Sequence, residues 1–247
     1  MNDILVLLIN LDRSPERLET SSAALAAADV NFERISGVDG AQIDLNALPN
    51  FDAARARRAM GRVLTAGEVG CYLSHLAAIS RFLETDAAQC LVLEDDFEVQ
   101  PGAFETVAGL PGCLAGTNWD VAHLSQPAKK HFKIRPSTLP VEIHRAFYMP
   151  IIATALLWSR KGAAAFQAAC SQITLPVDLA LQSHICRTGV GYACAAPPLP
   201  ALDGDSEIGA GGRDRNTEKG LYFHSRKTAM KWRNNLAAIR RKRRELA

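Results

Sequence analysis

Residues 90–99, CLVLEDDFEV, read as a buried strand that runs directly into three carboxylates. The apolar run at its start is typical of a strand covered on both faces, as in a parallel sheet. Glu94, Asp95 and Asp96 follow this run without a break. Two like charges about 4 Å apart in a partly shielded site repel by about 4 kcal/mol, so the cluster needs water or a cation.

Other apolar runs alternate with helical patterns along the chain, which predicts an α/β fold with a mostly parallel sheet flanked by helices. Helix starts are indicated by proline after Ser14, by a capping box from Thr65 to Glu68, and by Ser159. We expect residues 43–62 to be irregular and residues 203–220 to form a loop. The predicted strands span 4–9, 31–38, 90–93, 120–124, 150–158 and 190–197, and the predicted helices 15–28, 65–84, 159–170 and 176–189.

In sheets of this kind, ligands bind outside the carboxyl ends of the strands. Alternation along an extended segment turns Glu94 and Asp96 to one side and Asp95 to the other. Two oxygen ligands on one side suit Mg²⁺ or Mn²⁺, and such an ion commonly holds substrate phosphates. The alternative is a solvated loop, or acids at a helix start, and the spacing alone leaves both open.

Two further segments carry candidate chemistry. In INLDRSPERL (9–18), Arg13 and Arg17 flank a helix start and could bind an anion, or could simply solubilise an exposed face. In LPVDLAL (175–181), Asp178 is a lone acid among apolar neighbours, which suits a general base with a raised pKa. Its alternative role is a helix N-cap.

Several functional classes find no support. His75 lies in an amphipathic helix pattern and is expected to be a packed residue. No two histidines share a helix face, which argues against zinc hydrolysis. The chain has no GxSxG, P-loop or GxGxxG pattern. Aromatic residues make up 6% of the chain and no RNA or DNA motif is present, so we expect no nucleic-acid partner.

Composition places the chain among soluble globular proteins, with 247 residues and 48% hydrophobic side chains. No apolar run approaches the about 20 residues that span a bilayer, and MNDILVLLIN (1–10) lacks a cleavage-site pattern. The six cysteines show no CxxC pairing, which predicts free thiols in a reducing compartment. We therefore expect a cytoplasmic protein.

The formal net charge of +2 hides a basic end, because nine basic residues and one acid follow Ser225. Trp232, Leu236 and Ile239 recur there at helical spacing. This pattern predicts an interfacial helix that binds an anionic membrane surface, in which case the protein lies on the inner face of the inner membrane. A solvated tail and a nucleic-acid contact are the alternatives.

Taken together, these segments resemble glycosyltransferase family 25, the lipopolysaccharide-biosynthesis galactosyltransferases of bacteria and their collagen-modifying relatives. The resemblance runs from residue 4 to about residue 209 and is specific as a combination. Its pieces are INLDRSPERL (9–18), GVDG (37–40), LTAGEVGCYLSHLAAISRFL (64–83), LVLEDDFEV (91–99), WSRKGAAAF (158–166), PVDLAL (176–181) and DGDSEIG (203–209).

The resemblance implies a GT-A-like, Rossmann-type fold and transfer of a hexose with inversion, commonly galactose from UDP-galactose. It implies one glycosyltransferase domain over 1–222, with a nucleotide-binding half at about 1–125 and an acceptor half at about 126–222, before a basic tail at 223–247. The run ALLWSRK (155–161) departs from the family's usual G-Y-I-I-S-R-K, which leaves the acceptor and the donor sugar open.

The same resemblance assigns residues to roles. Glu94 and Asp96 would face the Mn²⁺ or Mg²⁺ ion, and Asp178 would be the catalytic base, with a metal-ligand role as its rival. Residues that would contact the UDP-sugar donor are Asn10, Arg13, Arg17, Asp39, Glu94 and Asp95. The expected acceptor is a lipid-linked oligosaccharide of a lipopolysaccharide or related surface glycan. Rival functions are a non-catalytic glycan- or nucleotide-binding module and metal-dependent phosphoryl transfer.

Overall fold

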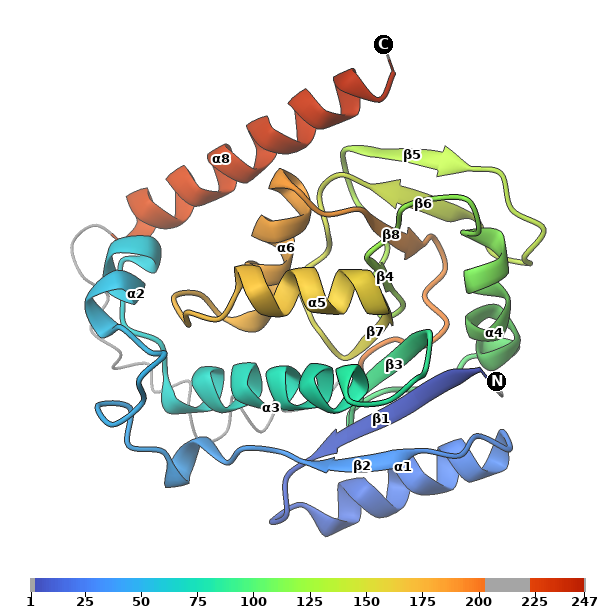
Figure 1. Ribbon diagram of the computed structural model, residues 1–247, viewed down its shortest axis with the longest axis horizontal. Coiled ribbons are helices and arrows are strands. Elements are labelled where there is room, and N and C mark those ends of the chain that lie inside the picture. Colours follow the sequence, from blue (N-terminus) through green and yellow to red (C-terminus); the bar gives the residue numbers. More distant parts are fainter. Residues whose placement is uncertain (1–2, 203–222, 247) are drawn as a thin grey trace.

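The structure is a computed structural model that describes residues 3–202 and 223–246. Helices cover both faces of a single eight-stranded sheet, as Figure 1 shows, so the predicted α/β class is confirmed. The loop expected at 203–220 and the DGDSEIG piece at 203–209 lie outside the described residues. The domain boundaries near residues 125 and 222 stay a prediction.

The sheet has the strand order β2-β1-β3-β7-β4-β8-β6-β5. Six strands run in one direction, whereas β7 and β6 run in the other, so the sheet is mostly parallel in direction but mixed in its pairings. The strands are β1 Ile4–Asn10, β2 Glu33–Ser36, β3 Gln89–Glu94, β4 Val121–His123, β5 Phe132–Arg135, β6 Ile143–Ala146, β7 Ala155–Ser159 and β8 Gly191–Cys194.

Each face of the sheet carries its own apolar core. Helices α2, α3, α5 and α6 pack on one face, whose core includes Tyr72 and Trp158, and α1 and α4 pack on the other, whose core includes Leu25 and Leu110. Strand alternation divides neighbours between the two cores. The helices are α1 Pro15–Ala27, α2 Ala53–Met60, α3 Ala66–Leu83, α4 Ala103–Cys113, α5 Arg160–Ala169, α6 Val177–Arg187 and α8 Phe223–Arg244.

Several of these boundaries follow from local signals in the sequence. Helix α1 has proline at its first position, and α3 carries the complete capping box between Thr65 and Glu68. The expectation of an irregular segment at 43–62 is wrong, because α2 lies within it. Asp52 caps that helix by accepting from the N–H of Arg55, and Gly61 ends it in the left-handed conformation.

The strand predicted at 150–158 forms only in its second half, as β7. Ile152 has a φ of 100°, a left-handed value that a β-branched residue rarely adopts, and it breaks the extended chain before the strand. The part of this segment before β7 lies beside the end of β3, where the N–H of Glu94 donates to the Thr154 carbonyl at 2.8 Å. Backbone strain of this kind occurs at functional sites.

The basic C-terminal segment is helix α8, and it packs against the body of the protein. Met230, Asn234 and Ala238 are buried on its inner face. Near its end, the Arg241 guanidinium donates to the carbonyls of Ile185 and Gly189 at 2.5 Å each. Within residues 3–202 and 223–246, none of the helices is long and apolar enough to cross a membrane.

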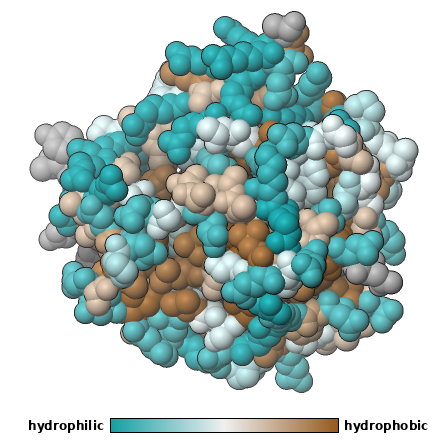
Figure 2. All heavy atoms as spheres, in the orientation of Figure 1, coloured by the Kyte–Doolittle hydropathy of each residue, from teal (hydrophilic) through white to brown (hydrophobic). Residues whose placement is uncertain are grey.

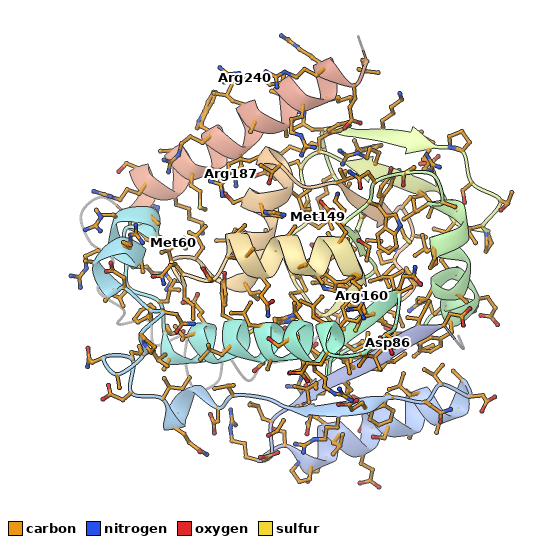
Figure 3. The ribbon with its side chains drawn as sticks, viewed as in Figure 1. Met60, Asp86, Met149, Arg160, Arg187 and Arg240 are labelled. Atoms are coloured by element: carbon orange, nitrogen blue, oxygen red, sulfur yellow. The ribbon has the colours of Figure 1, made fainter. Side chains whose placement is uncertain are left out.

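Arg160 closes the C-terminal end of α3 from the start of α5, as Figure 3 shows. Its guanidinium donates to the carbonyl of Leu83 at 3.1 Å and to that of Ala87 at 3.0 Å. The carbonyls of Phe82 and Thr85 also accept from it. A helix end leaves carbonyl groups without intrahelical partners, and the guanidinium of Arg160 donates hydrogen bonds to several of these carbonyls at once. The SRK piece of the sequence therefore has a structural role here.

We expect Arg160→Ala to lower the free energy of unfolding by about 3 kcal/mol, because it leaves several partly buried carbonyl groups without a hydrogen-bond donor. The measurement is urea denaturation followed by circular dichroism. Arg187→Ala is the matched control, since Arg187 is exposed on α6 (Figure 3), and its effect is expected to stay within about 0.5 kcal/mol. Equal effects for the two variants would contradict the capping role.

Candidate active site

The candidate site lies where β1 and β3 end side by side. The two strands pair in parallel, with Ile9 opposite Glu94, so Asn10 and the acidic triplet leave the sheet at the same edge. Carboxyl ends of parallel strands are where such sheets bind ligands. The chain bends at Asp95, which separates the directions of the three carboxylates.

Asp95 is held by the neighbouring strand and helix. Its carboxylate accepts from Asn10 Nδ2 at 2.6 Å and pairs with Arg17 Nη2 at 2.5 Å, while its carbonyl accepts from the Ser21 hydroxyl at 3.0 Å. Asn10 is only 2% exposed, and its side-chain oxygen accepts from Arg34 Nε at 3.1 Å. Asn10 and Asp95 therefore form a buried link between β1, β3 and α1, whereas both were predicted to contact the donor. Arg34 was missed by sequence reasoning.

Arg13 and Asp39 form a second pair at this edge. Arg13 Nε lies 3.1 Å from Asp39 Oδ2, and Asp39 caps the short helix η1 (Gly40–Gln42) by accepting from the N–H of Ala41. A Cβ on Gly40 would meet the backbone of Ala66 at 2.5 Å, so only glycine lets this loop touch the start of α3. The structure thus brings Arg13 to Asp39, and Arg17 to the acidic triplet.

Glu94 points toward helix α3. Its Oε1 lies 2.9 Å from His75 Nε2 and 3.4 Å from Cys71 Sγ. Burial acts to raise the pKa of Glu94, but the hydrogen bond and charge of His75, with the Cys71 thiol, outweigh it and the pKa is lowered. His75 was expected to be a packed residue, and its contact with Glu94 was missed. The signal was the four-residue spacing of Cys71 and His75, which places both on one helix face.

Asp96 is the least satisfied of the three acids. Its Oδ1 is buried and has no hydrogen-bond partner among residues 3–202 and 223–246, and Oδ2 lies 3.5 Å from Arg17 Nη2. Burial and the charge of Glu94 raise the pKa of Asp96 to about 6, and the charge of Asp95 adds to this, although the charge of Arg17 and a hydrogen bond of the carboxyl group with Thr154 oppose it. A buried carboxylate oxygen without a donor is the atom that a bound cation would satisfy.

Asp178 comes from the other half of the chain. It lies in the first turn of α6, where Pro176 is the N-cap, so the alternative role of Asp178 as an N-cap is wrong. Its Oδ1 accepts from the N–H of Leu179 at 2.7 Å. Burial raises the pKa of Asp178, and the charge of Glu94 raises it further. Glu94 therefore lies within electrostatic range of both Asp96 and Asp178.

These residues fit a hard divalent cation. Mg²⁺ or Mn²⁺ needs only one or two carboxylates when waters and substrate phosphates complete its coordination. Asp96 Oδ1 offers an open oxygen, and Asp178, within electrostatic range of Glu94, is a second acid of raised pKa. The predicted partner Glu94 is committed through Oε1 to His75 and Cys71, so it contributes charge and at most its other oxygen.

The fold and this edge of the sheet define a Rossmann-type α/β protein that is consistent with the GT-A fold of nucleotide-sugar transferases. Residues 3–111 match the sequence model of glycosyltransferase family 25 (LPS biosynthesis protein). The assignment to glycosyltransferase family 25 is thereby confirmed over this part of the chain. The match contains Asn10, Arg17 and the acidic triplet, and it does not reach Asp178.

Individual relatives agree with this assignment. The chain is 30% identical over 104 residues to a "Glycosyltransferase 25 family member" of Drosophila pseudoobscura pseudoobscura. This aligned segment covers 39% of this chain and 16% of the relative. It is 34% identical over 95 residues to the human "Inactive glycosyltransferase 25 family member 3", covering 37% and 16%. With mouse "Procollagen galactosyltransferase 2" the identity is 28% over 95 residues, covering 37% and 15%. The matched segment spans about one sixth of these relatives.

Proposed function

We propose that this protein is a metal-dependent, inverting glycosyltransferase that moves a hexose from a UDP-sugar, galactose above all, to the glycan of a lipid-linked acceptor. The proposed acceptor is a lipopolysaccharide or related surface glycan. One observation carries the proposal: the buried, unpartnered Oδ1 of Asp96 at the carboxyl end of β3. The family match over 3–111 and the name of the procollagen galactosyltransferase support the reaction class.

In this reaction different side chains of the chain have different roles. Asp96, with water, would hold a Mn²⁺ or Mg²⁺ ion, whose charge would offset the charge that builds on the UDP leaving group. Arg17 lies between Asp95 and Asp96 and holds both carboxylates in place from α1. Arg13, which is half-exposed and paired with Asp39, would contact the nucleoside.

Asp178 is the proposed base. Inversion at the anomeric carbon needs one group to take the proton of the acceptor hydroxyl as that oxygen attacks. Burial and the charge of Glu94 raise the pKa of Asp178, and a carboxylate of higher pKa is a stronger base than an ordinary one. Its position in the first turn of α6, within electrostatic range of Glu94, supports this role.

The test is release of UDP from a panel of UDP-sugars by the purified full chain, with Mn²⁺, with and without glycan acceptors. The expected result is one donor whose turnover needs both Mn²⁺ and acceptor, and whose product has the inverted anomeric configuration. Absence of turnover with any donor, together with absence of Mn²⁺-dependent UDP binding, would overturn the proposal. Release of inorganic phosphate without sugar transfer would instead favour phosphoryl transfer.

A non-catalytic module is the second candidate, because two of the matching relatives, from human and cattle, are named inactive or probably inactive. Calorimetry with UDP and Mn²⁺ separates the two functions. A transferase binds UDP far more tightly with the metal than without it, whereas a module that has lost this chemistry shows no metal dependence.

We also propose that the protein is cytoplasmic and that α8 binds the inner face of the inner membrane. Trp232 is 63% exposed and Leu236 is 45% exposed, and Arg240, four residues further along α8, follows on the same face of the helix. Hydrophilic residues predominate where α8 crosses the top of the view in Figure 2, and Arg240 projects outward in Figure 3. An apolar pair beside several cations suits anionic headgroups.

We expect the double variant Trp232→Ser with Leu236→Ser to bind anionic liposomes at least about 10-fold more weakly than the wild type, because both side chains leave the acyl boundary. Sedimentation with liposomes at low salt measures this. Ile134→Ser is the matched control, since Ile134 is also exposed, at 55%, but lies on β5. Deletion of α8 is a poorer test, because it also uncovers Phe147 and Cys186. Equal binding by all three proteins would remove the membrane proposal.

A further inference from the structure

Helix α3 passes the end of β3 (Figure 1), and three ligand-type side chains lie close together there. One ligand atom each of Cys71, His75 and Glu94 lies within 4.8 Å of the others. Across residues 3–202 and 223–246 this is the only trio of His, Cys, Asp or Glu side chains that meets this distance. Its composition of one sulfur, one nitrogen and one oxygen differs from the carboxylates assigned to Mn²⁺.

The fold fixes the three positions independently. Cys71 and His75 are four residues apart on α3, so they lie one turn apart on the face that covers the sheet. Two metal ligands at this spacing on one helix is a known way to bind zinc. Glu94 is the last residue of β3 and meets the pair from the sheet side.

The distances suit a small tetrahedral ion. With Zn–N and Zn–O bonds near 2.1 Å and Zn–S near 2.3 Å, ligand atoms around tetrahedral zinc lie about 3.3–3.8 Å apart. Here Glu94 Oε1 is 2.9 Å from His75 Nε2 and 3.4 Å from Cys71 Sγ. Small side-chain movements bring all three atoms to that spacing.

We propose that Cys71, His75 and Glu94 form a binding site for a borderline divalent cation, with Zn²⁺ as the best fit. Thiolate and imidazole ligands favour Zn²⁺ over Mg²⁺ or Mn²⁺. His75 is 2% exposed, whereas the Glu94 side chain is 22% exposed, so the ion enters from the Glu94 side and keeps a fourth position open there. As the Zn–S bond forms, the Cys71 proton passes to solvent, with no change of oxidation state.

The competing explanation is that Cys71 and His75 only orient Glu94 through hydrogen bonds and bind no metal. The variant Cys71→Ser distinguishes this explanation from the metal site. A serine hydroxyl still donates to Glu94, so the variant keeps the hydrogen bond but loses the thiolate ligand. Cys113→Ser is the matched control, because Cys113 is also a half-buried free thiol and its Sγ contacts Ser137 Oγ at 3.4 Å, away from the trio.

The experiment titrates the metal-free full chain with Co²⁺, which gives a thiolate-to-cobalt absorption band when a cysteine binds it, and then displaces Co²⁺ with Zn²⁺. We expect one equivalent of Co²⁺ and a band in the wild type and in Cys113→Ser. In Cys71→Ser the band is lost and Zn²⁺ binds at least about 100-fold more weakly. No band in the wild type, or an unchanged band in Cys71→Ser, overturns the proposal.

A measurement on the unaltered chain removes any dependence on variant folding. Zn²⁺ is expected to slow alkylation of Cys71 by a maleimide, read by mass spectrometry, and to leave alkylation of Cys113 unchanged. Equal rates at Cys71 with and without Zn²⁺ would overturn the site. Neither measurement involves a sugar donor, so failure here leaves the proposed transferase function intact, and absence of transfer would leave this site standing.

Discussion

Replacing Asp96 by asparagine is expected to abolish sugar transfer, by about 1,000-fold or more, while the metal-free protein becomes more stable. The amide cannot supply the charged oxygen that a Mn²⁺ ion at the leaving group requires. It also removes a charge that repels Glu94 and Asp95. The measurements are UDP release with saturating donor and the thermal midpoint with and without Mn²⁺. Mn²⁺ with UDP should raise the midpoint of the wild type only.

The same residue gives a pH dependence of known sign. Its pKa is raised from 3.8 to about 6 in the folded protein, so between these values the folded state binds more protons than the unfolded state. Stability from this group therefore falls as pH rises from about 4 to about 6, by about 2–3 kcal/mol in all. Asp96→Asn should flatten the curve in that interval. Glu98→Gln is the control, since Glu98 is exposed two residues further on and should change neither transfer nor the curve.

Asp178→Asn is expected to lower transfer by about 10²- to 10⁴-fold while Mn²⁺-dependent binding of UDP is retained. The reason is that a base acts only on the acceptor hydroxyl. Isothermal calorimetry and steady-state transfer assays measure the two effects separately. If Asp178 is a metal ligand instead, the metal-dependent binding falls together with transfer.

Azide tests whether Asp178 is the base, because azide can attack the anomeric carbon without first losing a proton. The new C–N bond forms as the bond from that carbon to the UDP oxygen breaks. Azide is therefore expected to restore UDP release in Asp178→Asn but not in Asp96→Asn. Asp86→Asn is a control on an exposed loop residue (Figure 3) and should behave as the wild type. Failure of azide to rescue Asp178→Asn, with donor binding intact, would argue against the base.

Much of the fold is encoded locally. An apolar run predicts β1, proline after Ser14 starts α1, and the pairing of Thr65 with Glu68 starts α3. The acidic triplet could be placed at a strand end because CLVL leads straight into it. All six cysteines are unpaired, as their spacing predicted. These features depend on neighbours within a few residues, which a sequence displays directly.

Features that depend on distant partners could not be predicted. The reversed direction of β7 follows from its position between β3 and β4 in the sheet, and sequence alternation does not report direction. Helix α2 is short and rich in arginine, and part of its stability comes from the contact with α8. The docking of α8 itself depends on Arg241 reaching carbonyls more than fifty residues away.

The sequence by itself determined that three carboxylates stand at the end of a buried strand in an α/β protein. Only the tertiary structure decided what each of them does. Asn10 and Arg17 bind the carboxylate of Asp95. Cys71 and His75 contact the carboxylate of Glu94. Asp96 keeps a buried oxygen without a partner among the described residues. The physical reason is that a carboxylate's role depends on which donors and charges reach it, and here those arrive from other strands and helices.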